Sequence, residues 1–295
     1  MTIFNLGSIN ADMTYRVRRL PRPGETIATQ SLDRGLGGKG ANMSVAAARA
    51  AGRTAHIGAV GPDGAWAVER LMEYGVDTRS IARVDAATGH AIIAVDEAGE
   101  NTILIHPGAN AAITPEMVAA ALDMARPGDL FLFQNETSAQ AEGAEMAREK
   151  GLRVAHAAAP FDAEAVKRVL PLLDLIVLNA VEAEQLEEAT GKPPEALPIR
   201  DVIITLGSEG CRWVHTPTGA SRDFPAYRVT PVDTTGAGDT FTGYLLAGLD
   251  RGMPMAQSIA QAQRAAAIMV TRRGTADVIP DLKDVQDSLL GRDEG

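Results

Sequence analysis

Two carboxylates enclose a run of small residues in the segment Val232-Asp233-Thr234-Thr235-Gly236-Ala237-Gly238-Asp239-Thr240-Phe241. The apolar pattern that follows predicts a helix over Thr240–Arg251. Small residues just before a helix leave several backbone N–H groups directed at one point, which forms an anion hole. A carboxylate at that point suits proton abstraction beside a phosphoryl group in transfer. The alternative, that Asp239 is only the N-cap of the helix, is less favoured because Asp233 adds a second carboxylate.

A second glycine-rich segment, Gly35-Leu36-Gly37-Gly38-Lys39-Gly40-Ala41-Asn42, precedes another predicted helix. It matches G-x-G-x-x-G literally, but the dinucleotide fingerprint requires a buried strand before it, and residues 26–33 are polar. A Walker A loop would need Ser or Thr after the lysine, where Gly40 stands. Two interpretations stay open. The turn displays Lys39 and Asn42 beside free backbone N–H groups for a hydroxyl or anionic ligand, or it serves only tight helix packing.

Short apolar segments alternate with amphipathic stretches, which is typical of βα units around a mostly parallel sheet. The predicted buried strands are Ile3–Leu6, Ala55–Val60, Leu130–Phe133, Arg153–Ala157, Leu175–Leu178 and Val202–Leu206. The predicted helices are Ala41–Ala51, Ala65–Tyr74, Pro115–Ala125, Ala139–Lys150, Ala163–Val169, Ala180–Thr190, Thr240–Arg251 and Pro254–Thr271. We therefore expect an α/β fold whose sheet has helices on both faces.

Four half-polar segments interrupt this alternation: Asp12–Leu20, Glu25–Arg34, His90–Asp96 and Asn101–His106. Their alternating pattern favours antiparallel strands with one exposed face. We expect residues 1–295 to form a single domain with these strands, at about 12–34 and 90–106, inserted as a small β-sheet lid. A sheet this small buries little on its own, so it should cover a site, a partner subunit or both.

The composition limits the classes of binding partner and the compartment that we expect for this protein. There are 28 Lys and Arg against 38 Asp and Glu, a net charge of -10, so nucleic acid is not an expected partner. One cysteine, Cys211, cannot form an internal disulfide, and the five histidines show no metal-ligand spacing. No signal peptide and no apolar stretch of about 20 residues is found. The expectation is a cytoplasmic protein without a membrane segment.

Taken together, the two glycine-rich segments resemble those of the ribokinase-like (PfkB) family of sugar and nucleoside kinases. The resemblance covers almost the whole chain and includes further motifs: Gly7-Ser8-Ile9-Asn10-Ala11-Asp12, Gly108-Ala109-Asn110, Gln134-Asn135-Glu136, Asn179-Ala180-Val181-Glu182 and Thr205-Leu206-Gly207-Ser208-Glu209-Gly210. It implies the ribokinase-like fold. It further implies a lid-to-lid homodimer, with a sugar and ATP as substrates.

The resemblance also assigns the site residues. Asp239 would take the proton from the sugar hydroxyl, and Gly236, Ala237 and Gly238 would form the anion hole with it. With Asp239, the sugar pocket would comprise Asn10, Asp12, Gly38, Lys39, Asn42 and Glu136. The nucleotide site would comprise Asn179, Thr205, Gly207, Ser208, Gly210, Gly238 and Gln263.

Two cations follow from the same resemblance. Mg²⁺ would be held indirectly by Glu182 and Asn179, through water and phosphate. K⁺ would bind near Asp233, Thr235, Val270, Arg273 and Thr275. Two positions depart from the family pattern. Val278 stands where a serine oxygen is expected, and Arg264 replaces a small residue beside the adenine site.

The expected activity is ATP-dependent phosphorylation of a sugar. The sugar-site motifs are most similar to those of members that convert D-ribose to D-ribose 5-phosphate. Three alternatives stay open: a family kinase for another sugar or a nucleoside, a non-catalytic sugar- or nucleotide-binding regulator, and an NAD-dependent oxidoreductase. The regulator is disfavoured by the intact Asp239, and the oxidoreductase rests on the literal G-x-G-x-x-G alone.

Overall fold

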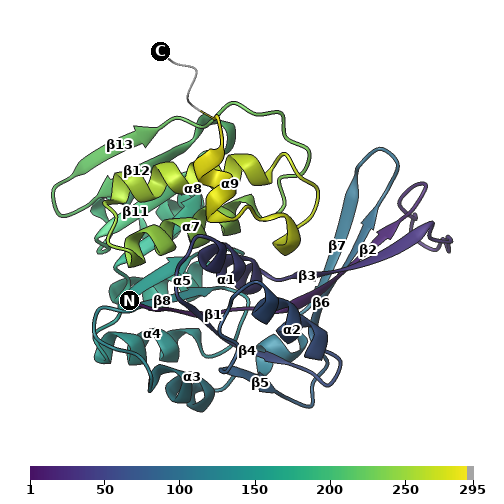
Figure 1. The fold of residues 1–295 in the computed structure, drawn as a ribbon, viewed down its shortest axis with the longest axis horizontal. Coiled ribbons are helices and arrows are strands. Elements are labelled where there is room, and N and C mark those ends of the chain that lie inside the picture. Colours follow the sequence, from purple (N-terminus) through teal and green to yellow (C-terminus); the bar gives the residue numbers. More distant parts are fainter. Residues whose placement is uncertain (291–295) are drawn as a thin grey trace.

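A nine-stranded sheet forms the centre of the protein, whose computed structural model describes residues 1–290 (Figure 1). The strand order is β13-β12-β11-β10-β9-β8-β1-β4-β5. All neighbours from β5 to β11 pair in parallel, and β12 and β13 extend the sheet in antiparallel fashion. The strands are β1 Ile3–Leu6, β4 Thr54–Val60, β5 Ile81–Arg83, β8 Leu130–Gln134, β9 Arg153–Ala157, β10 Leu175–Asn179, β11 Asp201–Thr205, β12 Cys211–His215 and β13 Ala220–Phe224.

Helices cover both faces of this sheet, because alternate residues of its central strands are apolar on opposite sides. Leu130 and Leu132 pack with α1, α7 and α8, whereas Phe131 and Phe133 pack with α3–α6. The helices are α1 Lys39–Arg49, α2 Ala65–Glu73, α3 Pro115–Leu122, α4 Gln140–Glu149, α5 Ala163–Val169, α6 Ala180–Thr190, α7 Ala237–Asp250, α8 Met255–Met269 and α9 Leu282–Asp287. The predicted α/β fold is confirmed.

A separate four-stranded sheet projects from one side of the body as the predicted lid (Figure 1). Its order is β3-β2-β6-β7, with β2 Asn10–Arg16, β3 Ser31–Gly37, β6 Gly89–Val95 and β7 Asn101–His106. The outer pairs are antiparallel, but the central pair β2–β6 is parallel, so the prediction of antiparallel pairing throughout is wrong. The parallel pair arises because a βα excursion through the main sheet lies between β2 and β6.

Several predicted boundaries shift. The strand predicted over Glu25–Arg34 begins only at Ser31, because the Pro- and Gly-containing stretch before it forms a loop. Helix α7 begins at Ala237, three residues earlier than predicted, so Asp239 lies in its first turn. The antiparallel edge strands β12 and β13 and the helix α9 were not predicted.

The carboxyl ends of β1 and β8 lie next to each other at a topological switch point. From β1 the chain continues outward through β4 and β5, and then returns to the other side of β1 with β8. In open parallel sheets ligands bind in the crevice at such a point. The lid strands β2 and β3 enter and leave the body at the same edge, between β1 and α1.

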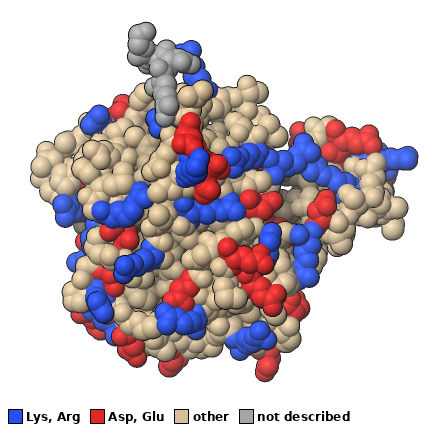
Figure 2. Space-filling model, in the orientation of Figure 1, with Lys and Arg blue, Asp and Glu red and all other residues tan. Residues whose placement is uncertain are grey.

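No helix within residues 1–290 is long and apolar enough to cross a membrane. Figure 2 shows basic and acidic side chains interspersed over the body and the lid.

We predict that Gly40→Ala destabilises the protein by roughly 1–3 kcal/mol. A Cβ atom at position 40 would overlap the backbone of Gly7 and Ser8, where the start of α1 crosses the end of β1. The free energy of unfolding in urea is the measurement. Gly35→Ala is the control, because a Cβ at position 35 has no heavy atom within 4 Å. Equal stability of both variants would contradict the close approach.

Candidate active site

Glu136 connects the two strands at the switch point to the start of α1. Its Oε2 atom accepts hydrogen bonds from the Ser8 hydroxyl and from the Lys39 amide, the latter at 3.1 Å. The next two amides of α1 are also bound, Gly40 N to Ser8 Oγ at 3.3 Å and Ala41 N to the Ser8 carbonyl at 2.9 Å. The expectation of free N–H groups at this helix start is therefore wrong. A ligand at the start of α1 would therefore contact side chains and not free backbone amides.

Asn42 and Asp239 join the two predicted glycine-rich segments. The Nδ2 atom of Asn42 donates to Oδ2 of Asp239 at 2.9 Å, although the residues are 197 positions apart. Asp239 is only 8% exposed and Asn42 only 5%. The Oδ1 atom of Asn42 is buried with no hydrogen-bond partner. A buried unpaired acceptor costs about 1–3 kcal/mol, so this atom is suited to receive a ligand hydroxyl.

The start of α7 offers the free donors that α1 lacks. Its N-cap, Gly236, has φ 76° and no side-chain cap. The amide of Ala237 donates to the Thr234 carbonyl at 3.2 Å, but within residues 1–290 the amides of Gly236, Gly238 and Asp239 have no backbone partner outside the helix. These three amides are therefore available as donors to an anion, whereas the Ala237 amide is already bonded to Thr234.

The lid contributes Asn10 and Asp12 through strand β2. Asn10 is 5% exposed, and its Oδ1 atom accepts from Nδ2 of Asn110 at 2.8 Å. Asn110 in turn accepts the amide of Ile9 at 2.9 Å, which fixes the point where the chain leaves β1 for the lid. The carboxylate of Asp12 lies against Gly37 on the neighbouring strand β3, where a Cβ atom would overlap it.

Electrostatic interactions show that these residues share one site. Burial, together with Glu136 and Asp239, raises the pKa of Asp12 to about 7. Burial also raises the pKa of Glu136 and of Asp239, and Lys39 opposes both shifts. The pKa of Lys39 is raised, mainly by Asp239 and further by Glu136 and Glu182. One ammonium group therefore lies among several partly buried carboxyl groups.

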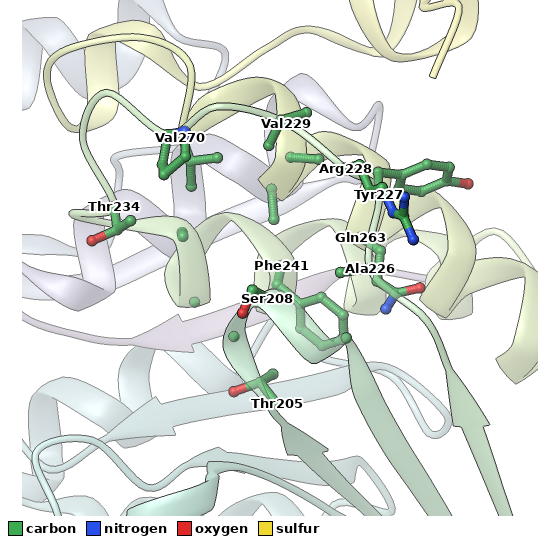
Figure 3. Close-up of a pocket in the computed structure, with 17 residues that line it drawn as sticks. Thr205, Ser208, Ala226, Tyr227, Arg228, Val229, Thr234, Phe241, Gln263 and Val270 are labelled. Carbon is green, nitrogen blue, oxygen red and sulfur yellow. The ribbon is translucent and has the colours of Figure 1, made fainter. Parts of the chain in front are cut away.

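A cavity of about 450 Å³ lies on the other side of α7, lined by Thr205, Gly207, Ser208, Gly210, Ala226, Tyr227, Arg228, Val229, Pro231, Thr234, Ala237, Gly238, Phe241, Gln263, Ala266, Ala267 and Val270 (Figure 3). It brings together every predicted nucleotide-binding residue except Asn179. Sequence reasoning missed the segment 226–231 and Phe241. Phe241 follows the Gly-Asp motif by two residues, a signal that could have placed it there.

Asn179 instead caps helix α6. Its Oδ1 atom accepts the Glu182 amide at 2.8 Å, and Oε2 of Glu182 accepts the Asn179 amide at 2.8 Å, a reciprocal capping box. Oε1 of Glu182 has no hydrogen-bond partner within residues 1–290, and Glu182 interacts electrostatically with Lys39 and Asp239. Among the described residues no group of three or more His, Cys, Asp or Glu could hold a metal by itself. The Oε1 atom of Glu182 would suit Mg²⁺, which keeps several waters and binds with phosphates.

The residues predicted for K⁺ lie around Asp233, whose Oδ1 atom accepts the Thr235 amide at 3.0 Å. Asp233 lies beside Val270, whose carbonyl accepts the amides of Val232 at 2.7 Å and Asp233 at 3.1 Å. Gly274 N donates to Asp233 Oδ2 at 3.4 Å. Both lone pairs of the Val270 carbonyl are thereby used, and Val278 offers no side-chain oxygen. A cation at the Val270 carbonyl would share that oxygen with two amide donors.

Arg264 lies outside the nucleotide cavity. Its Nη2 atom is 3.3 Å from the Tyr227 hydroxyl, and its guanidinium carbon is 5.3 Å from the centre of the Tyr227 ring. Tyr227 lines the cavity and separates it from Arg264. Arg264 thus contacts the outer side of a residue that lines the nucleotide cavity.

The chain is similar to known proteins over nearly its whole length. Residues 2–282 match the sequence profile of the PfkB family of carbohydrate kinases. The ribokinase of Haemophilus influenzae is 34% identical over 98% of both chains. The crystal structure of Thermotoga maritima ribokinase superposes with a TM-score of 0.87 at 30% identity over 97% of this chain and 98% of that one. Arabidopsis thaliana ribokinase complexed with ribose and ATP gives 0.83 at 28% over 97% of both chains.

The fold and site thus define a sugar phosphotransferase. The chain belongs to the PfkB family of carbohydrate kinases, enzymes that phosphorylate a sugar hydroxyl.

We predict that Asp12→Asn stabilises the protein by about 1–2 kcal/mol more at pH 8 than at pH 5. Solvent screening keeps this difference below the value that the whole pKa shift would give. The pKa of Asp12 rises from 3.8 to about 7 on folding, so the folded state binds the proton more tightly. Stability is therefore lost as pH rises through this interval, and Asn cannot ionise. Urea unfolding at both pH values measures the difference. Asp33→Asn, on the exposed part of β3, is the matched control.

Proposed function

We propose that the protein transfers the γ-phosphoryl group of ATP to the primary hydroxyl of D-ribose, giving D-ribose 5-phosphate and ADP. The observation that carries this proposal is the position of Asp239. It is a buried carboxylate in the first turn of α7, bound to Asn42 on one side and adjacent in sequence to Gly238, which lines the nucleotide cavity. The relatives named above support ribose and ATP as the two substrates.

Asp239 would act as the general base. Its carboxylate takes the proton of the attacking hydroxyl as that oxygen forms a bond to the γ-phosphorus, and the bond from phosphorus to the leaving oxygen of ADP breaks. The free amides of Gly236, Gly238 and Asp239 face the charge that spreads over the phosphoryl oxygens. Lys39 favours the ionised form of Asp239, which burial alone would disfavour.

The sugar would bind between the lid and α1. Asn42 Oδ1 has no partner within residues 1–290, so it can accept a hydrogen bond from a sugar hydroxyl. The Asp12 and Glu136 carboxylates can accept hydrogen bonds from further hydroxyl groups. Lys39 would donate from its ammonium group, and Asn10, held by Asn110, would define the lid side of the pocket. Gly38 has φ 92°, and a Cβ there would lie 2.8 Å from the Ser8 carbonyl, so this turn must remain glycine.

ATP would occupy the cavity beside α7, with Mg²⁺ on its phosphates. When bound, Mg²⁺ would neutralise charge on the phosphate oxygens. Oε1 of Glu182 is the free carboxylate oxygen that could orient its water ligands. No step in this proposal depends on K⁺.

Asp239→Asn should lower kcat for ribose by about 10²- to 10⁴-fold with little change in KM, because the amide keeps the shape of the side chain but cannot take the proton. ADP release with ATP and Mg²⁺ is measured across ribose, 2-deoxyribose, fructose, tagatose and adenosine. We expect ribose to give the highest kcat/KM.

Asp250→Asn, at the other end of the same helix, is the matched control and should retain activity. A different preferred sugar, with activity still lost in Asp239→Asn, would keep the mechanism and refute ribose. Undiminished turnover in Asp239→Asn would refute the base assignment.

The lid is proposed to pair with the lid of a second copy. It exposes apolar side chains on both faces: Leu104 is 64% exposed, Ile105 61% and Leu32 54%. The register places Ile105 on the face that carries Asp12, through Ala91, and Leu104 on the opposite face. Covering these side chains would remove apolar surface from water and shield the edge strands.

The double variant Leu104→Glu, Ile105→Glu should therefore be monomeric at concentrations where the unchanged protein is a dimer. Buried glutamates at a lid interface would cost more free energy than the apolar contact supplies. Light scattering after size exclusion measures the mass. Met124→Glu, at an exposed apolar position at the end of α3, should leave the dimer intact. If the wild-type protein is a monomer at micromolar concentration, this proposal is contradicted.

A further inference from the structure

A second cavity, of about 520 Å³, lies between α7, α8 and α9, outside the site described above. Its polar lining residues include two arginines, Arg251 and Arg264. Gln257, Gln261 and Tyr227 also line it. None of its lining residues is acidic. A hollow lined by cations and amide donors is unusual on a chain whose net charge is -10.

Among residues 1–290 neither Arg251 nor Arg264 forms an ion pair with a carboxylate. Arg251 donates to Oε1 of Gln261 at 2.8 Å, and Arg264 donates to the Tyr227 hydroxyl at 3.3 Å. The Nε atom of Arg264 is buried with no acceptor. The cavity thus contains strong donors that still lack an anionic acceptor.

We propose that this cavity binds a small phosphate monoester that regulates the enzyme. Guanidinium groups bind phosphate oxygens through paired, charge-assisted hydrogen bonds, and Gln257 and Gln261 can add amide donors. Met253 and Val285 supply apolar surface for the organic part of the ligand. The volume is in the range of small-molecule sites and exceeds what inorganic phosphate would fill.

Tyr227 connects this cavity to the nucleotide cavity, because it lines both. In Figure 3 the Tyr227 ring points away from Phe241 and Val270. The guanidinium carbon of Arg264 lies 5.3 Å from the centre of that ring. A phosphate bound to Arg264 would compete with the Tyr227 hydroxyl for that guanidinium and place negative charge beside the nucleotide site. Both effects weaken ATP binding, so the ligand should act as an inhibitor; this part rests on the proposed use of ATP.

Phenyl phosphate is the probe, because it joins a phosphate to an apolar ring and resembles neither substrate. Calorimetric titration of the full-length protein without nucleotide should show binding that weakens at least tenfold in Arg251→Gln. Phenol, which lacks the phosphate, should not bind. Arg212→Gln, at an exposed arginine of β12, is the matched control and should bind as the unchanged protein does. Thermal unfolding confirms that each variant is folded.

Equal affinity in the unchanged protein and in Arg251→Gln would overturn the site. So would strict competition, in which the apparent Kd rises without limit as ADP is added, since that would place the probe in the nucleotide cavity. A limited rise in the apparent Kd that levels off supports two coupled sites.

In assays at saturating phenyl phosphate, KM for ATP should rise at least twofold, and it should not rise in Arg251→Gln. An unchanged KM would overturn the regulation. The binding experiment needs no turnover, so its outcome is independent of the proposed reaction.

Discussion

The Lys39 ammonium group is the positive charge around which the acidic side chains of the site are arranged. Burial raises the pKa of Asp239, Glu136 and Glu182, and Lys39 opposes each of these shifts. Without such a partner, buried carboxyl groups this close together would be driven to bind protons. Asp12, for which Lys39 is not among the compensating groups, shows the result, since its pKa reaches about 7. Lys39, at the start of α1, is therefore the charge that favours an ionised Asp239.

A buried polar network in the sheet fixes the position of the start of α1. Asn5 donates to the Gly40 carbonyl and to Ser44 Oγ, both at 2.8 Å, and accepts from Gln134 at 2.9 Å. His56 contacts Ser44 at 2.8 Å and the Gly7 carbonyl at 3.1 Å, and burial lowers its pKa to about 4, so it stays neutral. Strands β1, β4 and β8 are thereby joined to α1 by hydrogen bonds. Lys39 and Asn42 are positioned by the core of the sheet.

The start of α7 presents two successive residues to two different regions. Gly238 lines the cavity of about 450 Å³ beside α8, while the next side chain, Asp239, is bonded to Asn42. Because successive residues at a helix start point in different directions, one turn can present free amides to a phosphoryl group and a carboxylate to a hydroxyl. This geometry explains why glycines and an aspartate occur together there.

The sequence by itself determined the features that depend on neighbouring residues. The buried strands β1 and β9 and the helices α5 and α6 begin and end at the predicted residues, because a short apolar run or a helical period is a local property. The two glycine-rich segments were likewise recognisable from residue types and spacing, and so was Asp239 as a candidate for proton transfer. Six of the residues that line the cavity beside α7 followed from the family resemblance: Thr205, Gly207, Ser208, Gly210, Gly238 and Gln263.

Only the tertiary structure decided the features that join distant segments. The parallel β2–β6 pair joins strands some 80 residues apart, and edge strand β13 is too exposed and polar to show a buried pattern. Likewise, the amides of α1 are bound by Ser8 and Glu136, 32 and 97 positions away, so its donors are lost and those of α7 remain. Tyr227 lines two cavities, yet nothing in the residues beside it indicates this. Non-local hydrogen bonds and packing leave no local pattern, because the energy that forms them comes from partners the local sequence does not contain.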